Sequence, residues 1–132
     1  MAPLTLHLGA HRTASSSTQM SLIRMQDAGD LPGWRVFGPN QIRRTFTRTI
    51  DALSYAPGLA HPVIGRFAAR DAMKAINDSA VHCILSDENF LGPIDPGVVG
   101  DGGLYPNAHR HISALRRMTV QRDARVVLGV RN

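Results

Sequence analysis

A short segment near the start of the chain combines one cation with a cluster of hydroxyl groups. Arg12 precedes Thr13 and Ala14, and the run Ser15-Ser16-Ser17 follows directly. The alternating apolar residues 4–8 before it read as a strand, and the residues after it have helical spacing. A strand that leads through a loop into the start of a helix aims several backbone N–H groups at one point, where an anion binds. We therefore predict an anion site with Arg12 as its charge and the neighbouring hydroxyls as its donors.

Two other interpretations of this segment stay open. The usual nucleotide-triphosphate loop, G-x-x-x-x-G-K-[ST], would need Gly at Ala14 and Lys at Ser15, so a phosphate-loop kinase is disfavoured. The segment could also be an ordinary strand–helix turn in which a serine caps the helix. The coincidence of cation, hydroxyls and helix start favours the anion site.

The remaining elements alternate between strands and helices. We expect main strands at 4–8, 81–85 and 125–130 and a short strand at 34–37. The segment 81–85 is a near-continuous apolar run of the kind found in covered parallel sheets. We expect helices at 15–28, 41–54, 62–77 and 109–121, and a long loop over 86–107. Expected inward side chains include Ile42, Phe46, Ile50 and Leu53, then Ile64, Phe67, Ala68, Met73 and Ile76, and finally Ile112, Leu115 and Met118.

This order predicts an α/β fold, a three-layer parallel sheet with crossover helices, in a single domain over residues 1–132. A parallel strand is normally followed by a covering helix, and none follows residues 125–130. We therefore expect a domain truncated after the third main strand, with apolar surface uncovered at the sheet edge. Such an edge invites self-association.

The first loop resembles the 5′-phosphosulfate loop of the sulfotransferase family, particularly its bacterial members. Arg12 matches the basic position, Thr13 the hydroxyl position, and Ser15 and Ser16 the paired Ser/Thr, whereas Ala14 stands where Gly is usual. The strand that ends in Val130-Arg131-Asn132 resembles the one that carries the family's 3′-phosphate Arg. The resemblance spans about the N-terminal half of a family domain, and a weaker likeness covers residues 85–90, where related proteins place acceptor-site groups.

This resemblance implies a P-loop NTPase-like fold and transfer of a sulfuryl group from 3′-phosphoadenosine 5′-phosphosulfate to a hydroxyl or amine of a small-molecule or glycan acceptor. It implies that Arg12, Thr13, Ala14, Ser15, Ser16 and Ser17 hold the phosphosulfate and that Arg131 holds the 3′-phosphate. Such transfer needs neutralised charge on the leaving phosphate and a base for the acceptor. Glu88 is the first candidate for this base, and Asp87 and His11 are the next candidates. For Glu88, a solvated or helix-capping carboxylate is the favoured alternative, and for Arg131 a frayed terminal residue stays equally open.

The composition of the chain narrows the kind of ligand and the cellular compartment that we expect. The chain has 43% hydrophobic and 19% charged residues and carries a net charge of +5, almost all from arginine, which suits phosphate and sulfate oxygens. Its one cysteine, Cys83, lies in an apolar run and is expected to be buried, so no intrachain disulfide forms and a reducing compartment is indicated. No leader or membrane span is found, and we expect a cytoplasmic protein.

Rival functions remain beside the enzyme. A non-catalytic remnant would bind an anion or a partner without turnover. A basic nucleic-acid-binding module is disfavoured because no aromatic side chains are expected to lie with the arginines of 43–48 and 116–122 on their solvated faces. Phe46, the one aromatic residue within these segments, is expected to face inward. A metal site is disfavoured because His109 and His111, two residues apart on a helix, point in different directions.

Overall fold

The computed structural model describes residues 2–9, 15–55, 62–92, 99–100 and 103–129. Four parallel strands form its main sheet: β1 (Leu4–Gly9), β2 (Trp34–Phe37), β3 (His82–Ser86) and β6 (Ala124–Gly129). Their order across the sheet is β2-β3-β1-β6, so the first strand lies inside the sheet between the third and the sixth. The α/β class and the parallel sheet predicted from the sequence are therefore confirmed.

Helices connect these strands. They are α1 (Ser15–Asp27), α2 (Pro39–Ile42), the π-helical η1 (Arg43–Thr47), α3 (Arg48–Tyr55), α4 (Pro62–Asn77), the 3₁₀ helix η3 (Glu88–Leu91) and α5 (Ala108–Thr119). A small hairpin of β4 (Val99–Gly100) and β5 (Gly103–Leu104) also interrupts the expected long loop.

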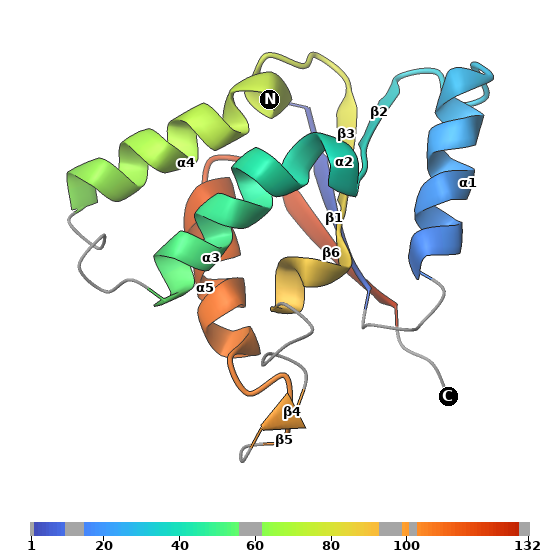
Figure 1. The fold of residues 1–132 in the computed structure, drawn as a ribbon. Coiled ribbons are helices and arrows are strands. Elements are labelled where there is room, and N and C mark those ends of the chain that lie inside the picture. The colour runs from blue at the N-terminus through green and yellow to red at the C-terminus, as the bar shows by residue number, and fades with distance from the viewer. Residues whose placement is uncertain (1, 10–14, 56–61, 93–98, 101–102, 130–132) are drawn as a thin grey trace.

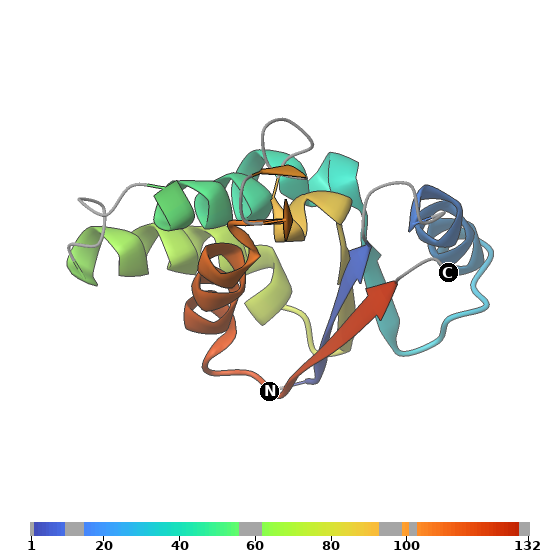
Figure 2. The ribbon, with the colours of Figure 1, turned by 90° about the horizontal axis from the view of Figure 1, so that it is seen from below.

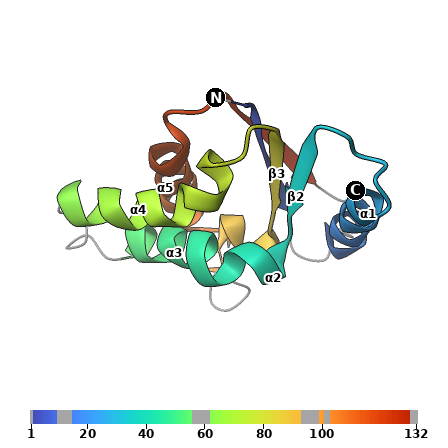
Figure 3. The same ribbon diagram turned by 90° about the horizontal axis from the view of Figure 1, so that it is seen from above.

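The helices cover the two faces of the sheet unequally (Figures 1, 2 and 3). Helix α1 lies alone on one side, whereas α2 to α5 gather on the other. This division follows from the strand order, because right-handed crossovers that move in opposite directions along a sheet place their helices on opposite faces. The connection from β1 to β2 moves one way, and those from β2 to β3 and from β3 to β6 move the other way.

The core lies between the sheet and the larger helix layer. Leu4, Leu6 and Leu8 alternate along β1 and are at most 2% exposed, as an interior strand requires. Across from them pack Phe46 and Ile50, which confirms the expected face of the 41–54 segment. Cys83 is buried as expected. The core also contains Ile42, Met73, Ile76, Leu85, Phe90, Leu115 and Met118.

Several side chains expected inside are outside. Phe67 is 62% exposed and Ala68 is exposed, because α4 turns the stripe Ala69, Ala72, Met73 and Ile76 inward. These four positions have the i, i+3, i+4, i+7 spacing of one helix face, and two of them are alanines that carry little hydrophobic signal.

Helix α5 shows the same kind of difference. Its inward stripe is His111, Ala114, Leu115 and Met118, whereas Ile112 is 49% exposed. His111 belongs to the core because Asp51 of α3 lies 3.1 Å from its Nε2, a partner 60 positions away in the sequence. His109 is exposed, so the two histidines do point in different directions as expected.

Candidate functional site

The carboxyl ends of β1, β3 and β6 lie at one edge of the sheet, and the predicted site residues follow these ends. Gly9 is paired with Gly129, so β1 and β6 end side by side. His7 is paired with Ser86, which is the last residue of β3. The connections that leave β1 and β3 run in opposite directions, and in open α/β sheets ligands bind at such a switch point.

Helix α1 begins at this edge (Figure 1). Its first turn is Ser15-Ser16-Ser17-Thr18, and the side chains of Ser16 and Ser17 are exposed. The first N–H groups of a helix have no partner within the helix, and the helix dipole makes this end positive. The start of α1 is therefore suited to an anion. The predicted residues Arg12, Thr13, Ala14 and Arg131 lie outside the described residues, as does His11.

Helix α1 is fixed to the sheet by polar as well as apolar contacts. Gln26 Oε1 accepts a short hydrogen bond from the backbone N–H of Val36, and Ile23 packs against Gly38. Gln19 is buried, whereas Met20 and Met25 are 50% and 41% exposed. The helix therefore faces the sheet with a partly polar stripe, which the apolar spacing alone did not reveal.

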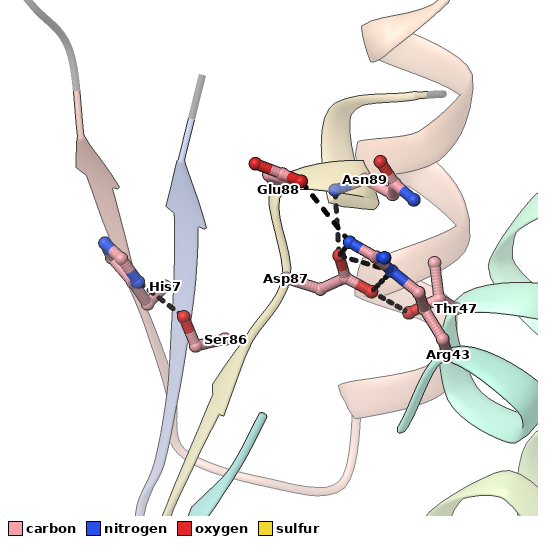
Figure 4. A network of polar contacts seen from close by, with 7 residues as sticks. All are labelled: His7, Arg43, Thr47, Ser86, Asp87, Glu88 and Asn89. Carbon is pink, nitrogen blue, oxygen red and sulfur yellow. Dashed lines mark hydrogen bonds and ion pairs between the residues drawn. The ribbon is translucent and has the colours of Figure 1, made fainter. Parts of the chain in front are cut away.

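A buried carboxylate organises the end of β3 (Figure 4). Asp87 is 0% exposed and accepts hydrogen bonds from Arg43 NH2 at 3.0 Å and from Thr47 Oγ1 at 2.8 Å. It also accepts from the backbone N–H of Asn89 at 3.1 Å, which makes it the N-cap of η3. With these donors around both oxygens, Asp87 anchors the segment and is poorly placed to take a proton from a substrate.

Glu88 follows directly and is more accessible. Its side chain is 23% exposed, and its Oε1 lies 3.4 Å from Arg43 NH2. The two carboxylates hold the pKa of Arg43 above its usual value, chiefly through the hydrogen bond to Asp87. Arg43 thus joins η1 to the start of η3, and it is an ion-paired residue where a solvated helix face was expected.

A second polar pair lies on the face of the sheet toward α1. His7 Nδ1 and Ser86 Oγ are 2.6 Å apart, and burial lowers the pKa of His7 (Figure 4). A lowered pKa favours the neutral imidazole at neutral pH, which can accept a proton. The sequence interpretation missed this pair. Its signal is a pair of polar residues on one face of each strand, Thr5 and His7 in β1 and His82 and Ser86 in β3.

Two further classes of site can be assessed in the described part of the chain. Among those residues, no three His, Cys, Asp or Glu side chains lie close enough to hold a metal ion. No helix within the same ranges is long and apolar enough to cross a membrane.

Comparison with known proteins gives no match: no family model, no curated protein and no solved structure matches the chain.

Proposed function

We propose that this chain is a sulfotransferase-like protein that binds 3′-phosphoadenosine 5′-phosphosulfate at the carboxyl end of β1 and transfers its sulfuryl group to a hydroxyl or amine. The observation that carries the proposal is the placement of the hydroxyl-rich start of α1 directly after an interior parallel strand, at the switch point of the sheet. The resemblance of residues 6–17 to a phosphosulfate loop supplies the chemistry.

The strand order supports this class over two other nucleotide-binding folds. The Rossmann order places the second strand beside the first, and the flavodoxin order places the first strand between the second and the third. Here β1 lies between β3 and β6, the third and fourth strands of the main sheet. This order is compatible with the P-loop NTPase-like fold that the resemblance implies.

In the proposed reaction, the acceptor oxygen or nitrogen forms a bond to sulfur while the bond from sulfur to the bridging phosphate oxygen breaks. Arg12 neutralises the charge that grows on the departing phosphate, and Ser15, Ser16 and Ser17 hold its oxygens. Arg131 binds the 3′-phosphate, and Glu88 accepts the acceptor's proton. Glu88 starts η3 one residue after the buried Asp87, so its backbone position is fixed beside the end of β1.

The test is sulfuryl transfer itself, with a panel of small hydroxyl and amine acceptors and glycans and detection of the adenosine bisphosphate product. We expect Glu88→Gln to lower turnover by roughly 100-fold or more, as for removal of a general base. Asp71→Asn, which changes an exposed carboxylate on α4, is the matched control and should leave turnover unchanged. Undiminished turnover in Glu88→Gln would reject the base assignment.

A second candidate is a non-catalytic protein that binds the anion and turns nothing over. It is favoured by the engagement of both carboxylates that follow β3, since Asp87 has donors on both oxygens and Glu88 is paired with Arg43. Nucleotide binding by a folded chain with no transfer to any acceptor would place this candidate first.

A further inference from the structure

An apolar groove lies on the side of the sheet opposite α1, between α5 and the edge strand β6. Its volume is about 330 Å³. Its floor includes Leu6 and Leu8, and its walls come from the outer side of α5 and from β6. The full lining is Leu6, Leu8, Ile112, Leu115, Arg116, Thr119, Val120, Arg122, Ala124 and Val126.

The rim of this groove exposes large apolar side chains. Val120 is 74% exposed, Val126 is 61% exposed and Leu128 is 53% exposed. Ala124 and Val126 line the groove, and Leu128 shares their face because side chains alternate along a strand. A contiguous apolar strip of this kind is a marker of a binding surface.

The same groove carries positive charge without a carboxylate. Arg122 is only 8% exposed, and its bonded acceptors in the described residues are neutral: the carbonyl oxygens of Ile76 and Ala2 and the side-chain oxygen of Asn77. Its Nε is buried without a partner in that part of the chain. Arg116, on the wall of the groove, is exposed. Two guanidinium groups therefore make an apolar groove attractive to anionic groups.

The sequence around the groove has the same bias. Residues 108–129, which form α5 and β6, contain five arginines and one carboxylate, Asp123. A second copy of this chain would bring the same arginines to the contact, and like charges oppose such a pairing.

The backbone of β6 completes the surface. Within the described residues β6 pairs with β1 alone, so its other edge presents N–H and C=O groups that no described strand uses (Figure 2). An open edge recruits an extended segment through main-chain hydrogen bonds, and the neighbouring grooves select its side chains. A lipid surface offers no such directional partners, so the open edge favours a peptide strand over a membrane.

We propose that β6 and this groove dock an extended acidic segment of a partner protein, added to the sheet as a further strand. On the groove side, its apolar side chains pack beside Val126 and Leu128, with a carboxylate reaching Arg116. On the other side, its carboxylates lie toward Arg125, which is exposed and points away from the groove. This inference does not depend on the proposed enzymatic function.

The experiment titrates the full chain with a short peptide of alternating valine and glutamate that carries one further glutamate on its valine face, where it can reach Arg116. The comparison peptide carries lysine in place of every glutamate. We expect the acidic peptide to bind and to slow hydrogen exchange of the β6 amides, and the basic peptide not to bind. Arg116→Glu should lower the affinity for the acidic peptide by roughly fivefold to tenfold, since it replaces an attraction with a repulsion. Arg70→Glu, an exposed arginine on α4, is the matched control and should leave affinity unchanged.

Three results would overturn the proposal. The first is a folded chain that binds neither peptide, or binds both equally. The second is a concentration-dependent dimer in which the β6 amides are protected without peptide, which would assign the edge to a second copy. The third is Arg116-dependent binding to vesicles of anionic lipid with no binding of the acidic peptide, which would assign the groove to a membrane surface.

Discussion

Removal of the buried carboxylate Asp87 should destabilise the fold strongly, because three different groups depend on it. Asp87→Ala removes the N-cap of η3, which costs about 1 kcal/mol. It leaves the hydroxyl of Thr47, at a residue only 2% exposed, without its acceptor, at a cost of about 1–2 kcal/mol. Arg43 is 43% exposed and regains water, so its loss is limited to about 0.5 kcal/mol. We expect a total loss of about 3 kcal/mol.

Urea unfolding followed by circular dichroism measures this loss as a lower midpoint at unchanged slope. Asp87→Asn keeps one oxygen for the backbone N–H of Asn89 but turns a donor toward Arg43 or Thr47, so its cost should be intermediate. Asp71→Ala on α4 is the surface control and should change stability by no more than about 0.5 kcal/mol. An Asp87→Ala protein as stable as this control would refute the assignment of Asp87 as the anchor.

Three further perturbations have expected outcomes. Burial lowers the pKa of His7, so on acidification the unfolded chain binds a proton at a higher pH than the folded chain does. Stability should therefore fall as the pH drops below about 6.5, and the urea midpoint of His7→Gln should fall less steeply over the same range. Arg122→Met removes the guanidinium that donates to the carbonyl oxygens of Ile76 and Ala2, and only the first of these also accepts from the backbone N–H of Ser79. This variant should cost about 2 kcal/mol by urea unfolding. In Gly38→Ala the new Cβ would lie 2.8 Å from Ile23 Cδ1, and we expect a loss of stability of about 1 kcal/mol. The loss should be smaller in an Ile23→Val background, which lacks that atom.

Each of these outcomes has a control. Burial and, secondarily, the nearby arginines lower the pKa of His82 too, so part of the acid sensitivity should persist in His7→Gln. An unchanged pH slope in that variant would contradict the role given to His7. Arg117→Met, at an exposed position on α5, should be nearly neutral beside Arg122→Met. If Gly38→Ala costs as much stability in the Ile23→Val background as in the original chain, the contact with Ile23 is not the cause of the loss.

The strands were the most predictable part of the fold. The apolar runs at 4–8, 34–37, 81–85 and 125–130 became β1, β2, β3 and β6 within a residue or so at each end. Their alternation with helices predicted a parallel sheet, because parallel neighbours need crossover connections. The lateral order of the strands did not follow from the sequence, since it depends on long-range packing.

Helix faces were less predictable than helices. Phe67 and Ile112 were expected inside because they are large and apolar, but smaller or polar residues such as Ala69 and His111 face the interior instead. The buried His111 has Asp51 as a partner, and the closeness of these two side chains is set by the packing of α3 against α5. A residue's own type cannot reveal such a partner.

At the candidate site, too, the sequence predicted which residues follow β3 but not which partners they have. The carboxylates Asp87 and Glu88 were predicted to follow a strand, and they do follow β3, but their different environments were not apparent from the sequence. Asp87 is buried under Arg43 and Thr47, which come from a helix 40 or more positions earlier. An Asp side chain often accepts a hydrogen bond from the backbone N–H two residues further on, as Asp87 does from Asn89. That local tendency could have identified Asp87 as a structural residue.

We propose that the end of β1 and the start of α1 bind a phosphosulfate nucleotide, and calorimetric titration with adenosine 3′,5′-bisphosphate tests this binding most directly. We predict selective binding of the bisphosphate over 5′-AMP by roughly tenfold or more, since the 3′-phosphate adds a charge-assisted contact. Arg12→Ala should abolish this binding, whereas Arg24→Ala, at the far end of α1, should preserve it. No binding by a demonstrably folded chain, or equal binding by Arg12→Ala, would contradict the claim.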